Sequence, residues 1–513
     1  MKGEKTMKRY KLFAMGLAMV GALSLSSCAE DYLDTAPTDK IGDVEVIQNL
    51  DNLYAALNGI HREMVSQESG RQAMGGEPGF MMMRDCEGDD MTWLTNTWMK
   101  ANWLGWQANM NATASDNYHV WRIHYQWILN ANKILEGLET VPVATGEEKL
   151  YDQIKGEALC IRAFAHFDLV QIYAGRYKQG GGNSQLGIPY RETSEVTEMA
   201  RHTVEEVYSK INEDLNEATS LLAGIKANDV NHYTEKVAWG LKARVALAMQ
   251  DYTNAAAYAE KAIQLAEADG HKLMTGSVND KGEYAGQLFC GFADIATDTD
   301  EGMYVALTPD DQTVYFYSFY AYMSWNFSST AIRQGVKAIN ADTYDTMSET
   351  DLRRGWWDPT GKMDVPTTAF KKTEYQNRKF TARDVSDAVG NVAFMRLAEM
   401  YLIAAEANVR AGQDAKAQEI FTKFQITRDP EYVAQGNTGE ALAEEIMNSR
   451  RVELWGEGFR FTDLKRLNLP IKRGRNFDIT FCTFLEKEAG ADGWIWEIPK
   501  IETDYNKLCE KNY

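Results

Sequence analysis

Four tryptophans lie close together in one polar segment of the chain: Trp93, Trp98, Trp103 and Trp106. The first three recur every five residues, and each such step turns about 140° on a helix. They therefore cannot form one buried stripe on a helix, which favours exposed rings over core packing, the alternative. We predict ligand contact for Trp98 and Trp103, with hydrogen bonds from Asn102 and Arg84.

A second aromatic segment runs from Tyr315 to Phe327, where eight of 13 residues are aromatic. In an extended strand, alternation would place rings on both faces, one packed inward and the other open to a ligand. Core packing is again the alternative, because large aromatic side chains are highly buried on average. For the open face we predict four ligand-binding residues: Tyr320, Tyr322, Trp325 and Asn326.

The chemistry of both segments suits a sugar. A sugar ring has an apolar face of C–H bonds and a rim of hydroxyl groups. Flat aromatic rings cover the face, and forked side chains such as Arg, Asn and Asp bind the rim. The segments therefore predict carbohydrate binding, with a peptide ligand as the alternative that aromatic content favours less.

The sequence offers no catalytic or metal-binding motif. None of the seven histidines belongs to an HExxH motif. His119 and His124 lie about 140° apart on a helix, too far round to share a metal ion. The glycine loop at 180–183 lacks the spacing of a phosphate-binding loop. We predict no enzyme, no cofactor and no metal site. A polysaccharide-degrading enzyme is an alternative. Such an enzyme uses two carboxylates at a set separation, and the sequence does not give the distance in space between carboxylates such as Asp89 or Asp90 and any other.

Charge and cysteine content exclude further classes of protein. The chain has 54 basic and 74 acidic residues, a net charge of −20. Such a chain gains nothing from releasing counterions at phosphates, so we expect no nucleic-acid partner. Six cysteines without a CxxC pair exclude a disulfide-built scaffold and a metal cluster.

Residues 1–27 have the pattern of a secretory signal peptide, with basic residues first and then an apolar run from Leu12 to Leu25. This run is too short to span a bilayer, which takes about 20 residues. It is followed by Ser26-Ser27-Cys28, and the junction resembles a bacterial lipobox. We predict cleavage before Cys28, a lipid on its thiol as the membrane attachment, and a tether over 28–43.

Amphipathic helical patterns dominate the rest of the chain. Apolar residues at spacings of three and four predict four long helices, over 44–67, 117–138, 147–174 and 203–222. Thr203 and Glu206 predict a capping box at the start of the last one. Two stretches, 239–262 and 401–421, have the small-residue spacing of tetratricopeptide-type helix pairs. The stretch 271–392 between them is loop-rich, with a strand predicted at 303–307.

Five stretches together resemble the SusD/RagB family of outer-membrane nutrient-binding lipoproteins. They are CAEDYLD at 28–34, the helix at 157–173, RLAEMYLIAAEA at 396–407, RRVELWGEGFRFTDLKR at 450–466 and WEIPK at 496–500. The resemblance implies a mostly α-helical fold, in which tetratricopeptide-like helix pairs form a scaffold packed against a loop-rich half with short strands. It also implies an N-terminal region over 44–228 and a C-terminal region over 229–513, intertwined in one unit.

The resemblance also implies a function. It implies a non-catalytic lipoprotein, facing the extracellular side of the outer membrane, that captures a glycan. The glycan would pass to a SusC-like TonB-dependent transporter as the partner protein. A peptide ligand, as on the RagB side of the family, is the alternative.

The charged segment 450–466 is interpreted as structural rather than catalytic. Glu453 and Glu457 lie four residues apart, on one face of a helix expected to end at Gly458. Paired arginines and carboxylates brace a protein interior more often than they catalyse a reaction. We predict three such pairs: Arg460 with Asp463, Arg396 with Glu399, and Arg162 with Glu157.

Overall fold

The computed structural model describes residues 48–66, 75–93, 101–226, 229–308 and 319–513, apart from the side chains of residues 101 and 102. The predicted signal peptide, Cys28 and the tether lie outside these ranges, as does Trp98. These expectations stay predictions.

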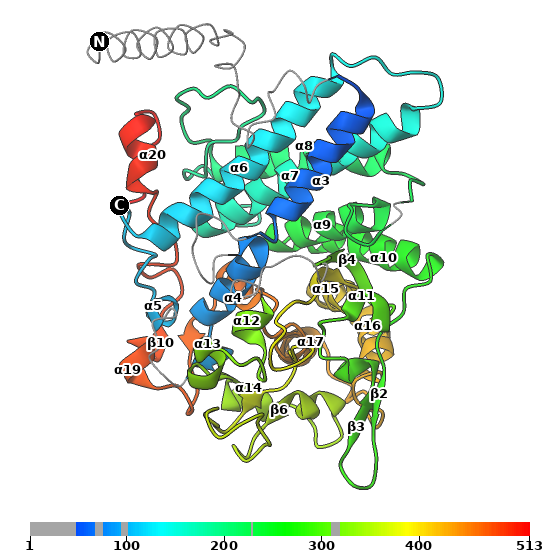
Figure 1. Cartoon of the computed structure of the whole chain (residues 1–513), viewed down its shortest axis with the longest axis vertical. Helices are drawn as coiled ribbons and strands as arrows, with labels where there is room; N and C mark the ends of the chain where they lie inside the picture. The colour runs from blue at the N-terminus through cyan, green and yellow to red at the C-terminus, as the bar shows by residue number, and fades with distance from the viewer. Residues whose placement is uncertain (1–47, 67–74, 94–100, 227–228, 309–318) are drawn as a thin grey trace, which may run out of the picture.

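A row of packed helices forms the scaffold (Figure 1). Its members are α3 (Leu50–Glu63), α6 (Ser115–Leu138), α7 (Glu148–Tyr173), α8 (Val204–Leu221), α9 (Glu235–Ala248), α10 (Tyr252–Ala268), α15 (Leu397–Arg410), α16 (Asp414–Gln425) and α17 (Gly439–Glu453). Each helix packs against the next along this row, and α10 lies directly against α15. This contact joins the two predicted helix pairs, α9–α10 and α15–α16, into one scaffold. The mostly helical fold class is confirmed.

Local sequence signals explain how these helices begin and pack. The Thr203 hydroxyl oxygen accepts from the Glu206 N–H at 3.2 Å, and the Glu206 carboxylate accepts from the Thr203 N–H at 2.7 Å. The predicted capping box is therefore confirmed. Ala243 of α9 and Ala259 of α10 are fully buried. Gly240 of α9 lies against Met395, with no room for a Cβ atom. Small side chains thus let α9 approach its neighbours closely.

Short antiparallel strands hold the loop-rich half together. One sheet has the order β1 (Met91–Trp93), β5 (Lys337–Ile339), β7 (Gln376–Asn377) and β6 (Trp357–Asp358). Three strand pairs are β4 (Gly302–Ala306) with β8 (Val392–Arg396), β2 (Gly276–Val278) with β3 (Tyr284–Gly286), and β9 (Ile471–Lys472) with β10 (Glu486–Lys487). Strand β4 matches the strand predicted at 303–307, offset by one residue.

Short helices complete this half. They are α4 (Gly76–Glu87), α5 (Ala101–Leu104), η2 (Gln287–Phe289), α11 (Ile295–Asp298), α12 (Tyr320–Met323), α13 (Thr330–Gln334), α14 (Ala341–Tyr344), η3 (Leu352–Trp356), α18 (Arg460–Leu467), α19 (Ile479–Cys482) and α20 (Lys500–Tyr505). Helix α12 corrects the strand geometry that we expected within 315–327. Side chains on a helical turn do not alternate between two opposite faces as they do on a strand. The expected arrangement, with one aromatic face packed inward and the other open to a ligand, therefore does not form there.

Buried arginines and glutamates connect the scaffold to the loop-rich half, and we call this cluster the arginine brace. Its members are Arg353, Arg396, Arg428, Glu301, Glu453 and Glu457. Arg396 lies 2.7 Å from Glu457, and Arg428 lies 2.9 Å from Glu453. Burial alone would raise the pKa of Glu453, but the guanidinium groups of Arg428 and Arg396 outweigh it and hold that pKa well below its ordinary value. The charged segment therefore braces the fold, as predicted.

The individual pairs that we predicted are wrong, although the structural role is right. Arg460 pairs with Asp89 rather than with Asp463. Arg396 pairs within the arginine brace, and Arg162 lies 2.6 Å from Asp214. Helix α17 ends at Glu453, so Glu457 and Gly458 belong to the connection that leads to α18. Ion-pair partners here come from distant elements, which sequence spacing does not reveal.

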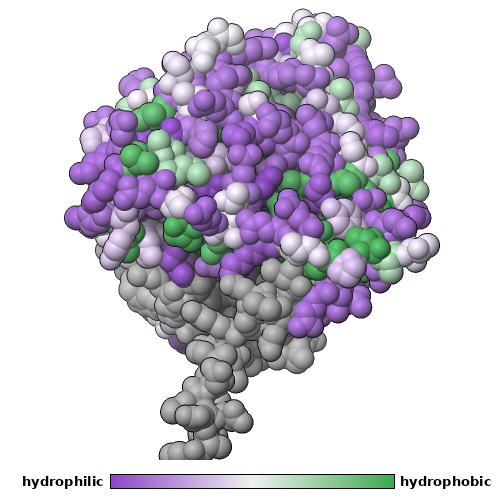
Figure 2. Space-filling view, turned by 90° about the horizontal axis from the view of Figure 1, so that it is seen from above, coloured by the Kyte–Doolittle hydropathy of each residue, from purple (hydrophilic) through white to green (hydrophobic). Residues whose placement is uncertain are grey.

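The face of the molecule seen from above is mostly hydrophilic, with small separate hydrophobic patches (Figure 2). Among the described helices, none combines the length and apolar character that a membrane span requires. All five cysteines in the described ranges are free thiols, and four of them are buried.

Candidate ligand-binding site

An open pocket of about 470 Å³ lies in the loop-rich half, beside the β2–β3 hairpin. Its walls come from segments far apart in the sequence: the hairpin, the residues after α12, the end of η3 and the loop that follows β7. It combines aromatic rings with polar groups, chiefly Tyr284, Phe289, Trp325, Trp356, Arg378 and Thr381. We call it the Trp325 pocket.

Trp325 is partly exposed and held in one orientation. Its indole N–H donates to Thr381 Oγ1 at 3.0 Å, and its backbone N–H donates to the Phe380 carbonyl at 3.2 Å. The indole therefore reaches the pocket already anchored. A fixed ring costs little conformational entropy when a ligand stacks on it.

Tyr284 supplies a second exposed ring. It is 39% exposed, at the start of β3, and its ring centroid lies 4.9 Å from that of Phe289. Its ring rests on Gly355, where an added Cβ atom would lie 2.8 Å from the ring carbons. Glycine at this position therefore lets the tyrosine ring lie flat against the backbone.

The floor of the Trp325 pocket is tied to the arginine brace. The Trp356 indole N–H donates to the Leu288 carbonyl at 2.7 Å, and the ring is buried. The Lys379 ammonium lies 4.9 Å from the Trp356 ring centroid and 2.6 Å from Glu457. Burial lowers the pKa of Lys379 more than the neighbouring Glu457 raises it. The floor of the Trp325 pocket is therefore held in place by the hydrogen bond of Trp356 and the ion pair of Lys379 with Glu457.

Arg378 adds hydrogen-bond donors at the rim. Its side chain is exposed, while its backbone N–H donates to the Trp356 carbonyl at 2.7 Å. No carboxylate of the described residues forms an ion pair with it. The guanidinium is thus free to bind hydroxyl groups, and with the two partly exposed rings it matches the two surfaces of a sugar.

The other residues predicted in the second aromatic segment serve the protein interior. Tyr320 and Tyr322 are buried, and the Tyr320 hydroxyl donates to the Asn391 carbonyl at 3.1 Å. Asn326 is buried and exchanges two hydrogen bonds of 2.8 Å with the backbone of Ala382. This is a correction for the three residues, because a buried side chain with internal partners cannot meet an external ligand. Asn326 instead fixes the loop behind Trp325.

The predicted exposure of the tryptophans in the first segment is also corrected. Trp93, Trp103 and Trp106 are buried, and the Trp103 indole N–H donates to Asp116 at 3.0 Å. Trp93 lies in β1 and Trp103 in α5, so the helical spacing argument does not apply to them. Because the two rings belong to different elements, both can point into the protein interior. Trp98 and the side chain of Asn102 lie outside the described residues.

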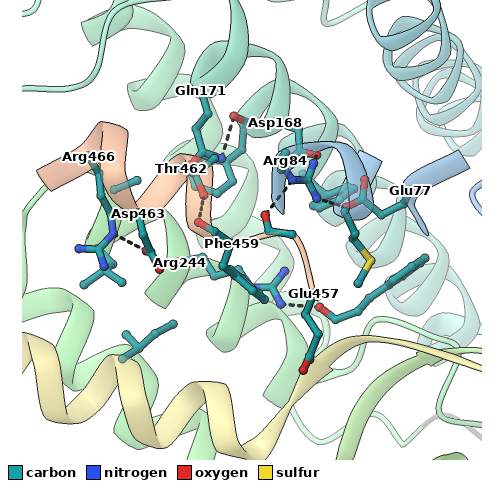
Figure 3. A pocket seen from close by; sticks show the side chains of 18 of the residues that line it. Glu77, Arg84, Asp168, Gln171, Arg244, Glu457, Phe459, Thr462, Asp463 and Arg466 are labelled. Atoms are coloured by element: carbon teal, nitrogen blue, oxygen red, sulfur yellow. Dashed lines mark hydrogen bonds and ion pairs between the residues drawn. The ribbon is translucent and has the colours of Figure 1, made fainter. Parts of the chain in front are cut away.

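Arg84 lines an internal polar cavity instead of the Trp325 pocket (Figure 3). It is buried, pairs with Glu77, and lies 2.7 Å from Asp168. The free space is about 60 Å³, enough for water but not for a sugar ring. Burial raises the pKa of Glu77 to about 7, although Arg84 acts in the opposite direction. Arg84 is thus corrected to a structural role.

Tyr284 and Arg378 are pocket residues that the sequence analysis missed. Both lie in the stretch 271–392, which was recognised as loop-rich and aromatic. A tyrosine in a tight hairpin beside Gly282 is a local signal for an exposed ring. Nothing in the spacing links either residue to Trp325.

Two family models match the chain. One, described as "Starch-binding associating with outer membrane", covers residues 31–247, and the other, described as "SusD family", covers residues 212–511. SusD-like protein P38 of Formosa agariphila is 21% identical over 506 residues, which cover 91% of this chain and 93% of that protein.

Solved structures share the fold. A SusD-like carbohydrate binding protein from Bacteroides vulgatus has a TM-score of 0.76 at 20% identity, covering 90% of this chain and 97% of that chain. Surface glycan-binding protein A from Bacteroides thetaiotaomicron, in complex with laminarihexaose, has a TM-score of 0.66 at 16% identity, covering 90% and 99%. Since the second family match alone spans more than half of the sequence, this chain belongs to the SusD family.

Proposed function

We propose that this chain is a non-catalytic, glycan-binding lipoprotein of the outer cell surface. It binds an oligosaccharide or polysaccharide in the Trp325 pocket and delivers it to a SusC-like TonB-dependent transporter. The observation that carries this proposal is the meeting of two rings open to solvent, Trp325 and Tyr284, with the exposed side chain of Arg378 in one open pocket.

Membership of the SusD family supports this proposal, as do two relatives of the same fold. One is described as carbohydrate binding and the other was solved with laminarihexaose. A non-catalytic role is supported by the pocket itself. A glycosidase needs two carboxyl groups that flank the scissile bond, whereas Glu283 is the sole carboxylate among the described residues that line the Trp325 pocket.

A ligand panel tests the proposal. Oligosaccharides and peptides are titrated calorimetrically against the purified chain, and each bound sugar is then analysed for its length. We expect an oligosaccharide to bind and to be recovered unchanged. Binding of peptides alone would instead support the RagB-like alternative, and shortened sugars would reveal an enzyme.

The predicted lipid anchor has its own test. Cys28→Ala removes the thiol that would carry the lipid. We expect the variant to leave the membrane fraction, because the lipid is the proposed attachment. A variant that stays with membranes after a carbonate wash would contradict the anchor but leave the glycan pocket untouched.

A further inference from the structure

Glu157 is a buried carboxylate whose ion-pair partners are histidines. It lies on α7 with 0% exposure. His61 of α3 places Nε2 at 3.0 Å from Glu157 Oε2, and His232, shortly before α9, places Nδ1 at 3.0 Å from the same oxygen. Among the described residues, no lysine or arginine pairs with Glu157. A buried charge needs a compensating partner, and here two imidazoles take that place.

The spacing of these three groups fits the first shell of a metal ion. Zinc binds imidazole nitrogen and carboxylate oxygen at about 2.0–2.2 Å, so neighbouring ligands of a tetrahedral site lie about 3.3 Å apart. Both nitrogen–oxygen distances to Glu157 are 3.0 Å, and all three ligand atoms lie within 4.8 Å of one another. Two histidines and one glutamate are also an established zinc ligand set.

The outer nitrogens of both rings already have the partners that metal-binding histidines use. His61 Nδ1 lies 2.9 Å from the Tyr304 hydroxyl, and His232 Nε2 lies 3.3 Å from the Tyr54 hydroxyl. A metal-bound histidine donates its second N–H to such an oxygen, which fixes the ring. The Tyr304 hydroxyl in turn lies 3.9 Å from Met64 Sδ, an acceptor for its proton. The two nitrogens that face away from Glu157 therefore already have oxygen partners, which form the outer shell of the site, when the two nitrogens that face Glu157 bind a cation.

A cavity borders the trio at His61. A cavity of about 230 Å³ is lined by His61, Tyr304 and Asn231. The Asn231 Oδ1 atom is buried and has no hydrogen-bond partner among the described residues. His61 is the member of the trio that lines this cavity, which has room for water, and the amide oxygen is an open hydrogen-bond acceptor in its wall.

A second buried trio in the same protein provides an internal contrast. Glu77, His124 and Asp168 also lie within 4.8 Å of one another. There the Arg84 guanidinium pairs with both carboxylates, so a positive charge already occupies the site (Figure 3). His124 Nδ1 lies 2.7 Å from the Val120 carbonyl oxygen, with which it forms a hydrogen bond. The arginine leaves this trio no need for a metal ion.

We propose that His61, Glu157 and His232 bind one divalent transition-metal ion, with Zn²⁺ the best match, which ties α3, α7 and the segment before α9 together. The ion takes the place of the protons between the two rings and Glu157, and it supplies positive charge directly to the carboxylate. The site is structural, since its carboxylate and both rings are buried. It does not depend on the glycan pocket.

Cobalt titration tests the site. The full chain, purified without a histidine tag, is analysed for bound metal, stripped with a chelator and titrated with Co²⁺. We expect about one ion per chain, with the ligand-field absorption of tetrahedral nitrogen and oxygen ligation. His232→Gln and His61→Gln should bind Co²⁺ at least about tenfold more weakly, whereas His124→Gln, in the second trio, should bind it like wild type.

Several results would overturn the proposal. These are a wild-type chain that takes up no Co²⁺, equal binding by His232→Gln, and the charge-transfer absorption of thiolate ligation, which would place the metal on a cysteine. Circular dichroism checks that each variant folds. Tyr304→Phe keeps all three ligands and provides a second readout: we expect about tenfold weaker binding, and unchanged affinity would contradict the outer shell.

Discussion

Trp103 and Trp325 each have the indole N–H fixed by a side-chain oxygen at 3.0 Å, but the two rings lie in different surroundings. Trp103 is 0% exposed and meets the ring of Trp93 edge to face, with 6.4 Å between centroids. Trp325 borders an open pocket. An anchored tryptophan is therefore available to a ligand only where neighbouring segments leave its surroundings uncovered.

Two glycines leave space for the rings and walls of the Trp325 pocket. Gly355 lies beneath Tyr284, and Gly291, with φ of +72°, faces Thr381 so closely that a Cβ atom would lie 2.8 Å from Thr381 Cβ. Side chains at these two positions would displace the pocket walls. In the first aromatic segment, Trp93 and Trp103 pack against each other and Trp106 packs against Phe461 and Trp494, so the three rings are buried.

Removing Trp103 should have the largest effect on stability. Trp103→Ala leaves a cavity and removes the indole donor to Asp116, so we expect the free energy of unfolding to fall by about 3–5 kcal/mol. Chemical denaturation measures this change. A loss below about 1 kcal/mol, combined with weaker glycan binding, would place Trp103 in the binding site after all.

Acid should weaken the ion pairs of Asp463 with Arg450 and Arg466, and the loss of stability should be smaller than that of Trp103→Ala. Burial alone would raise the pKa of Asp463, but Arg450 and Arg466 outweigh it and lower that pKa from 3.8 to about 2. A lowered pKa contributes stability that is present above the unfolded value and lost as the pH falls through the folded value. The shift corresponds to about 2 kcal/mol, lost between about pH 4 and pH 2.

Asp463→Asn provides the measurement for this pH dependence. The variant should be less stable than wild type at neutral pH, and the difference should narrow as the pH falls towards 2. Denaturation curves at a series of pH values show the trend. A difference that stays constant with pH would mean that Asp463 has the same pKa in the folded and the unfolded protein.

Loosening the anchor of Trp325 should have the smallest effect. Thr381→Val removes the oxygen that accepts from the indole N–H, at nearly constant side-chain volume. We expect glycan binding to weaken by about 0.5–1.5 kcal/mol, because the ring loses its fixed orientation. Calorimetry with the bound oligosaccharide checks it, and Thr360→Val, which lies outside the pocket lining, serves as the control. Equal losses in both variants would remove any special role for Thr381.

Local signals allowed much of the scaffold to be predicted. The apolar stripes of α6, α7 and α8 and the capping box at Thr203 depend on residues within a few positions of one another. The partners of Arg396 and Arg162, in contrast, come from distant segments, so spacing led to the wrong carboxylates. The same holds for His61, Glu157 and His232, which no motif connects.

For the candidate site, the types of residue could be predicted from the sequence, but only some of their positions could. Trp325 was named from its aromatic surroundings, and it does line the open pocket. Tyr320 and Tyr322 have the same composition around them, yet α12 turns them into the interior. Tyr284 and Arg378 join Trp325 only through tertiary structure, which spacing does not encode.

One titration decides between a binding surface and a set of structural rings. Trp325→Ala and Trp239→Ala are compared with wild type against the bound oligosaccharide. Both tryptophans are partly exposed, but Trp239 lies on α9, away from the pocket lining. We predict that Trp325→Ala loses about 1–3 kcal/mol of binding free energy while Trp239→Ala binds like wild type. Full affinity in a folded Trp325→Ala variant would contradict the proposed glycan site.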